Sequence, residues 1–170
     1  MITASFSSQK ITSSSPEAFS LYEKSRFGEK VQNKISYSLV ETLFLASIKK
    51  MQVFSNSKPL TEDSLLKKAK SIDKKIETKF SVFSDLRKKG YIVKTALKFG
   101  AEFRVYSKGI KPGEDHALWI LYTTKETDKL NWHEFSAKNR VAHSTKKKLL
   151  LAIVDEESSV TYYEISWVKP

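Results

Sequence analysis

The 170-residue sequence contains no cysteine. This excludes a disulfide scaffold, thiolate catalysis and any zinc or iron–sulfur site built on Cys ligands. No run of about 18 apolar residues occurs, and the N-terminal stretch MITASFSSQKITSSS lacks the apolar core of a secretory signal peptide. We therefore expect a soluble, cytoplasmic protein that does not contact a membrane.

The signatures of several enzyme classes are also missing. The sequence has no GxxxxGK[ST], GxGxxG, HExxH or GxSxG motif, which disfavours NTP hydrolysis, zinc proteolysis and acyl transfer by an elbow serine. A metal-dependent nuclease needs clustered carboxylates, and Glu102, Glu114 and Asp115 form only a loose set. We expect no metal site and no cofactor.

Acidic residues are outnumbered, with 19 Asp and Glu against 30 Lys and Arg, for a net charge of +11. The segments before and after residue 80 carry excesses of +6 and +5, so the positive charge belongs to the whole chain and not to a tail. Such a surface favours a polyanionic partner, of which nucleic acid is the first candidate. A generic lysine-rich solvated surface is the alternative.

The first part of the chain predicts a small domain of helices and strands over residues 1–79. β-prone residues at 2–15 indicate a strand pair, and Pro16 begins a helix that Gly28 should end. Ser38 and Glu41 form a capping box before a second helix, residues 51–56 indicate a strand, and Thr61 caps a third helix.

A longer helix is expected over residues 73–89, joining this domain to a second one at 80–170. Beyond Gly90 the pattern predicts strands at 91–97, 101–108 and 116–124, a helix at 131–145 and two closing strands at 149–155 and 160–168. In the last helix Trp132, Phe135 and Val141 are expected to be buried. The fold class is α/β (α+β), with a small N-terminal domain followed by a mixed-sheet domain.

The segment FRVYSKGIKPGEDH is the most distinctive in the chain. A strand ends at Tyr106, a Gly/Pro loop follows, and His116 opens the next strand, while RVAHSTKKKLL places three lysines where a helix gives way to a strand. A phenol, an imidazole and an ammonium suffice for metal-free RNA cleavage, in which one group takes the 2′-hydroxyl proton and another protonates the departing 5′-oxygen. A histidine at a strand start is, however, more often structural or merely exposed.

Residues 80–170 resemble the catalytic domain of the archaeal tRNA-splicing (tRNA-intron) endonuclease. The resemblance depends on DLRKKGYIVKTALKFGAEFRVYSKG, PGEDH, NRVAHSTKKKLLLAIVD and YYEISWVKP, in colinear order, and LYEKSRFG with SYSLVETLFL extends it to the N-terminal part. It implies cleavage of precursor tRNA at intron boundaries within a bulge-helix-bulge, without a metal, leaving 2′,3′-cyclic phosphate and 5′-hydroxyl ends. Ala96 departs from the family, which commonly has Gly after KT.

The resemblance also implies roles for particular residues. Tyr106 would be the general base, His116 the general acid and Lys147 the stabiliser of the transition state, while Arg140 and Trp167 would sandwich a flipped-out base. Histidine, with a pKa near 6.5, suits proton donation, whereas tyrosine, near 10, needs a cation such as Lys147 or Arg104 beside it. The alternatives are a buried strand position for Trp167 and a surface cation for Arg140. His133 and His143 are interpreted as structural or surface residues.

The acidic turn Asp155-Glu156-Glu157 resembles a family loop that docks into a basic cleft of a partner dimer, while the last strand pairs with its symmetry mate. This implies a tetramer, formed by self-association or with a second endonuclease subunit (homo or αβ hetero). A solvated hairpin is the simpler interpretation of the turn. Two other functions remain open: a non-catalytic structural or RNA-binding subunit of a splicing endonuclease, and a general basic RNA-binding protein.

Overall fold

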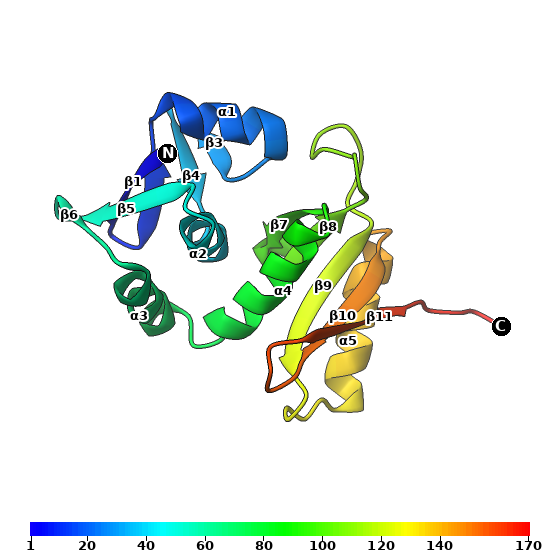
Figure 1. Ribbon diagram of the computed structural model, residues 1–170. Helices are drawn as coiled ribbons and strands as arrows, with labels where there is room; N and C mark the ends of the chain where they lie inside the picture. Colours follow the sequence, from blue (N-terminus) through cyan, green and yellow to red (C-terminus); the bar gives the residue numbers. More distant parts are fainter. The chain divides into compact units, whose positions relative to one another are not determined.

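The computed structural model describes residues 1–170 and divides into two compact units, Met1–Phe80 and Ser81–Pro170. Both units combine helices with a mixed β-sheet, as Figure 1 shows, so the predicted α/β class is confirmed. The division falls within helix α4 (Ile76–Lys88), the helix that was expected to join the two parts. None of the helices is long and apolar enough to cross a bilayer.

The N-terminal unit is built on a six-stranded sheet in the order β3-β4-β2-β1-β5-β6. Strands β1 and β5 are parallel and the other neighbours are antiparallel. The strands are β1 (Ile2–Ser7), β2 (Lys10–Ser13), β3 (Glu29–Val31), β4 (Lys34–Tyr37), β5 (Met51–Ser55) and β6 (Lys58–Pro59). The helices are α1 (Pro16–Ser25), α2 (Leu39–Ser47) and α3 (Glu62–Ile72).

Local sequence rules account for most of this unit. In β1 the apolar residues Ile2, Ala4 and Phe6 are buried and the Ser and Thr between them are exposed, because successive side chains of a strand point to opposite faces. The predicted capping box begins α2: the Ser38 side chain accepts the backbone N–H of Glu41, whose carboxylate accepts that of Ser38.

The segment between α1 and α2 differs from the sequence prediction. Helix α1 ends at Ser25, three residues before Gly28, with Arg26 in the left-handed conformation. Strands β3 and β4 then form a hairpin that the pattern did not predict. Gly28 is required here, since its φ is +76° and a Cβ would lie 2.4 Å from the Ile35 side chain.

The C-terminal unit has a five-stranded sheet in the order β11-β10-β9-β8-β7, in which β9 and β10 are parallel and the other pairs antiparallel. Its strands are β7 (Ile92–Ala96), β8 (Ala101–Tyr106), β9 (Trp119–Lys125), β10 (Lys148–Val154) and β11 (Val160–Ile165). A single 3₁₀ turn, η1 (Leu97–Phe99), joins β7 to β8, and helix α5 (Trp132–Ser144) joins β9 to β10. All five strands and the helix were predicted, with shifts of a few residues at their ends.

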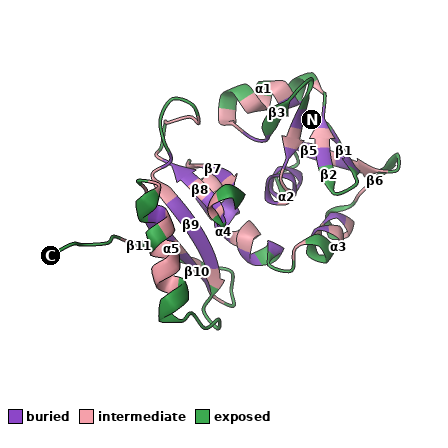
Figure 2. Ribbon diagram, turned by 180° about the vertical axis from the view of Figure 1, so that it is seen from behind, coloured by how far each residue is buried: buried purple, intermediate pink, exposed green.

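Two helical segments cover the two faces of this sheet. The part of α4 from residue 81 onward packs Phe83 against Phe103, with ring centroids 5.8 Å apart, and Asp85 accepts a 2.7 Å hydrogen bond from the Tyr162 hydroxyl. On the other face Ala142 of α5 packs in a cluster with Ile120 and Leu149. Figure 2 shows the resulting buried band along β8, β9 and β10.

Trp132 differs from its predicted burial, and the backbone at Ala96 explains why alanine is accepted there. Trp132 was predicted to be buried but is 83% exposed, because it occupies the first turn of α5, outside the stripe that Ala142 and Phe135 present to the core. Ala96 has φ −129° and ψ 34°. This backbone does not need glycine, so alanine in place of the family's usual residue is accommodated.

Candidate active site

Three segments that are far apart in the sequence meet at one end of the C-terminal sheet. Since β9 runs antiparallel to β8 and parallel to β10, the end of β8 lies beside the starts of β9 and β10. Two backbone hydrogen bonds fix the junction: Leu118 N–H to the Val105 carbonyl (2.9 Å) and Lys148 N–H to the Leu118 carbonyl (3.1 Å). Tyr106, the loop with His116, and Lys147 are therefore brought to the same end.

A cavity of about 670 Å³ opens at this end of the sheet. Its polar lining consists of Ser107, Asp115, His116, His143, Ser144, Lys146, Lys147 and Lys148. His116 and Lys147, two of the three catalytic candidates, thus share one pocket. A basic pocket that holds the His116 imidazole can both attract a phosphodiester and transfer a proton.

His116 lies at the end of a turn-rich loop. Gly113 has φ +95°, and Lys111 donates its backbone N–H to the Glu114 carboxylate at 3.1 Å. The backbone N–H of His116 donates to Asp115 Oδ1 at 2.6 Å, which fixes the main chain while the residue remains exposed. The imidazole is therefore accessible to a ligand in the pocket.

Lys147 follows the end of α5. Lys146 adopts a positive φ of 56°, and the Lys147 N–H donates to the Ala142 carbonyl at 2.9 Å, so the chain turns sharply from helix into β10. The Lys147 ammonium donates to the Thr145 carbonyl at 2.9 Å and lies 5.6 Å from the centre of the Phe99 ring. Both partners are neutral, so they do not cancel the positive charge.

Tyr106 is the last residue of β8, paired with Ile92 across the sheet, and is only 4% exposed. It is not part of the pocket wall, which begins at its neighbour Ser107. The structure therefore brings His116 and Lys147 together and leaves Tyr106 beside them in the sheet.

Lys148 is held differently from the other two lysines of the pocket. Its ammonium lies 2.7 Å from Glu164 Oε1, and the indole N–H of Trp119 donates to the other oxygen of that carboxylate at 2.8 Å. The hydrogen bonds from Lys148 and Trp119 lower the pKa of Glu164. This link ties β9, β10 and β11 together at the pocket end of the sheet.

Trp167 lies in the tail after β11 and is 58% exposed. Its indole meets the imidazole of His143 edge to face, with centroids 4.1 Å apart and an angle of 83° between the planes. Trp167 therefore lies next to a residue of the pocket wall. Arg140 is exposed on α5 and is not part of that wall.

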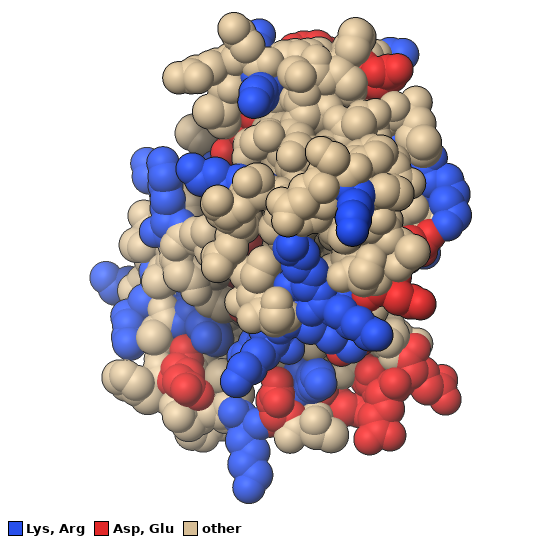
Figure 3. Space-filling model, turned by 90° about the vertical axis from the view of Figure 1, so that its left-hand side faces the viewer, with Lys and Arg blue, Asp and Glu red and all other residues tan.

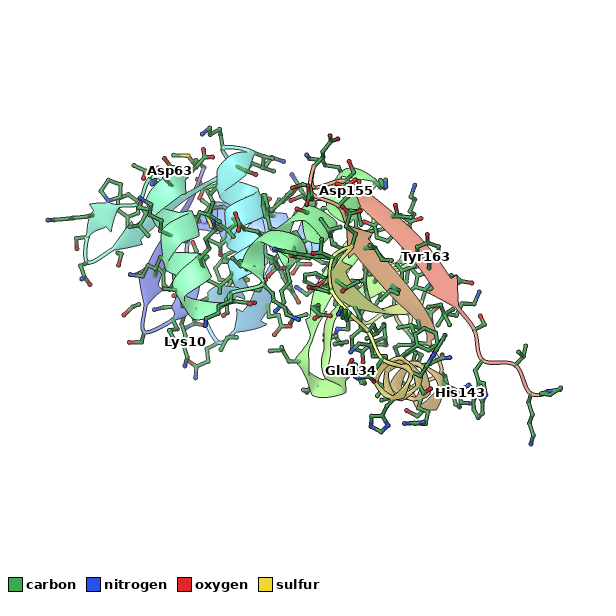
Figure 4. The ribbon with its side chains drawn as sticks, turned by 90° about the horizontal axis from the view of Figure 1, so that it is seen from below. Lys10, Asp63, Glu134, His143, Asp155 and Tyr163 are labelled. Atoms are coloured by element: carbon green, nitrogen blue, oxygen red, sulfur yellow. The ribbon has the colours of Figure 1, made fainter.

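His143 is a pocket residue that the sequence analysis interpreted as structural or surface; it is exposed and also lines the cavity. Figure 4 shows it projecting from α5 toward the C-terminal tail. Its position four residues before Lys147, at the end of the helix leading into β10, was the available indication. The loose carboxylate set is not assembled: Glu102 accepts the Thr123 N–H within the sheet, and only Asp115 lines the pocket. No three His, Asp or Glu side chains are grouped closely enough to hold a metal ion.

Basic side chains are prominent on the surface of the molecule. On the face drawn in Figure 3, Lys and Arg side chains cover several areas, and Asp and Glu side chains lie among them in smaller groups. The positive charge thus lies on folded surface, where it can act on a polyanion through long-range attraction.

Comparison with known proteins matches both parts of the chain. Residues 76–162 match the family model of the tRNA intron endonuclease catalytic C-terminal domain, and residues 2–66 match that of its N-terminal domain. A tRNA-splicing endonuclease of Thermococcus gammatolerans is 36% identical over 170 residues, 99% of each chain. One from Nanoarchaeum equitans is 39% identical over 138 residues, 78% of this chain and 88% of the relative. The resemblance seen in the sequence is confirmed, and the chain belongs to the tRNA intron endonuclease family.

Proposed function

We propose that this chain cleaves precursor tRNA at intron boundaries, in a bulge-helix-bulge, and does so without a metal. The 2′-hydroxyl of the nucleotide before the cut attacks its own phosphate, the bond to the 5′-oxygen breaks, and the products are a 2′,3′-cyclic phosphate and a 5′-hydroxyl. The observation that carries the proposal is the shared pocket of His116 and Lys147 in a chain of this family.

His116 is proposed as the general acid. Protonated imidazole gives its proton to the departing 5′-oxygen, and the exposure of His116 leaves room for an RNA strand to approach. Lys147 stabilises the extra negative charge of the phosphorane, a role supported by an ammonium whose partners within the chain are neutral.

Tyr106 is proposed as the group that removes the 2′-hydroxyl proton. A phenol acts as a base only once it has lost its own proton, and a nearby cation favours that loss. Arg104 lies two residues earlier in β8, so both side chains belong to the same face of the strand. Tyr106 is only 4% exposed, so the 2′-hydroxyl can reach the phenol only if the bound RNA or the loop that begins at Ser107 moves.

Arg140 and Trp167 are proposed to hold a flipped-out base. Guanidinium and indole planes stack on any base, which suits an enzyme that acts on many tRNA sequences. The exposure of both residues supports the role, as does the contact of Trp167 with a residue of the pocket wall.

We further propose that residues 1–79 and 80–170 act as two domains and that the enzyme is a tetramer, either of this chain alone or with a second endonuclease subunit. Strand β11 is at the edge of the sheet, where its outer backbone groups can pair with another strand. The acidic turn Asp155-Glu156-Glu157 would dock on a basic surface of a partner.

The test is cleavage of a bulge-helix-bulge RNA by the purified chain in excess EDTA. The proposal expects cutting at both bulges at a rate within about twofold of that without EDTA, with cyclic phosphate and 5′-hydroxyl ends identified by end-labelling and mass spectrometry. Complete inhibition by EDTA, reversed by a divalent metal, would contradict the metal-free mechanism. Binding without any cleavage would instead fit a non-catalytic RNA-binding subunit.

A further inference from the structure

The contact between His143 and Trp167 gives the pocket a feature that the proposed reaction does not use. His143 lines the same cavity as His116 and Lys147, and its imidazole meets the indole of Trp167 at a centroid distance of 4.1 Å. The same residue therefore lines this cavity and contacts the residue proposed to stack on the RNA.

The backbone of His143 is fixed by the end of α5. Its carbonyl accepts the N–H groups of Thr145 and Lys146, the latter at 3.0 Å, where the chain turns into β10. These hydrogen bonds fix the main chain to which the imidazole is attached, although the residue is exposed. Trp167, by contrast, lies two residues beyond the end of β11, in a tail without regular structure.

A tail residue needs a contact with the folded domain to hold its ring in one place. An edge-to-face pair of aromatic rings is a favourable arrangement, and the angle of 83° between the two planes fits it. An edge-to-face contact covers at most one face of the indole, and 58% of Trp167 is exposed, so the indole can offer a face to a base. Base stacking on such a ring tolerates any sequence.

We propose that His143 is a positioning residue that holds the indole of Trp167 beside the pocket, where the indole stacks on a base of the bound RNA. This rests on the proposed function, because it takes the stacking role of Trp167 as given. His143 acts through the packing of its ring and not by proton transfer, so a ring without nitrogen atoms serves equally well.

The test compares His143→Ala, His143→Phe, Trp167→Ala and the double variant His143→Ala/Trp167→Ala. Affinity is measured by anisotropy with a fluorescently labelled bulge-helix-bulge RNA that carries a 2′-deoxy nucleotide before each cut and so cannot be cleaved, and the cleavage rate of the unmodified RNA at saturating enzyme is measured separately. His133→Ala is the matched control, because His133 is an exposed histidine on the same helix but outside the pocket wall.

His143→Ala should weaken RNA binding about tenfold, as expected when the stacking of one base is largely lost, with a saturated cleavage rate within about twofold of wild type. The double variant should bind no worse than Trp167→Ala, while His143→Phe and His133→Ala should bind like wild type. Additive losses in the double variant would overturn the proposal. The proposal would also be overturned if His143→Phe bound RNA as weakly as His143→Ala, because the ring nitrogens and not the packing of the ring would then be needed.

His143→Phe decides the question even if His143→Ala fails to fold, since wild-type affinity supports the proposal and a tenfold loss refutes it. The binding measurement does not depend on catalysis. A wild-type chain that binds the RNA but does not cut it would refute the proposed function and still leave the coupling of His143 with Trp167 measurable.

Discussion

The two ends of the C-terminal sheet differ in charge and in the kind of residue they present. The end where β9 and β10 begin holds His116, His143 and the lysines Lys146–Lys148 around a cavity. The other end, where β10 turns into β11, holds the acidic turn Asp155-Glu156-Glu157. Figure 4 shows His143 and Asp155 at these separate places.

This difference suits the two ends of one small domain to different functions, RNA cleavage and subunit association. Groups that transfer protons and attract phosphate gather at the pocket end, whereas the acidic end would repel an RNA backbone and is better suited to a basic protein surface. Substitutions at the two ends should therefore affect different measurements: cleavage and RNA binding at one, association of subunits at the other.

The largest effect is expected at the pocket end, for His116→Ala. Removal of a general acid typically costs about 10²–10⁴-fold in rate, so single-turnover cleavage should fall by this factor. RNA affinity should stay within about threefold of wild type, because phosphate contacts elsewhere supply most of it. An unchanged cleavage rate would remove His116 from the mechanism.

Lys147→Ala should be the next most damaging change. Loss of a group that stabilises transition-state charge lowers the rate by about 10²–10³-fold. Lys146→Ala is the control, since Lys146 lines the same pocket in the neighbouring position and should affect mainly RNA binding. Equal losses of rate in both variants would mean that the pocket acts through its overall charge and not through one ammonium.

A smaller effect is expected at the acidic end, for the double change Glu156→Lys/Glu157→Lys. Asp155 is kept because its carboxylate accepts the Ser159 N–H at 2.8 Å and so maintains the turn. Sedimentation equilibrium should show self-association, or binding to a second subunit, weakened about tenfold, as charge reversal at a complementary interface predicts. Glu29→Lys, an exposed charge reversal in the N-terminal unit, is the control; equal weakening by it would argue against docking through the turn.

The smallest expected effect is on pH-dependent stability. Lys148 and Trp119 lower the pKa of Glu164 below its ordinary value of 4.5, so the ionised carboxylate stabilises the fold above that pH and loses this contribution as the pH falls through the lowered pKa. Glu164→Gln should reduce the Tm by about 2 °C at pH 7, a small value because the ion pair is exposed, and by less at pH 3. An equal reduction at both pH values would contradict this assignment.

Predictions from the sequence were most successful where structure depends on local chemistry. The Ser38–Glu41 capping box, Pro16 at the start of α1 and the apolar alternation of β1 each involve residues a few positions apart, and each is found as expected. The β3–β4 hairpin was missed because its strands are only three and four residues long, and because β4 is stabilised by pairing with β2, a contact that no local pattern encodes.

At the pocket, too, contacts between distant segments were harder to predict than local features. The motif resemblance indicated Tyr106, His116 and Lys147, but the residues that share a cavity depend on the parallel pairing of β9 with β10 through α5. That crossover places His143 in the pocket wall, whereas Tyr106 lies within the sheet and is only 4% exposed. Exposure of Trp132 was mispredicted for a related reason, since helical spacing alone does not say which turn of α5 extends beyond the sheet.

In the proposed mechanism the pocket activates a 2′-hydroxyl of the RNA itself. The most direct test is the cleavage rate of a bulge-helix-bulge RNA whose nucleotide before the cut carries a single 2′-deoxy substitution, with the unmodified RNA measured alongside. The modified site should be bound with normal affinity but not cut, while the unmodified second site should still be cleaved. Cleavage of the deoxy site at the normal rate would mean that water, and not the neighbouring hydroxyl, is the nucleophile, and would contradict the mechanism.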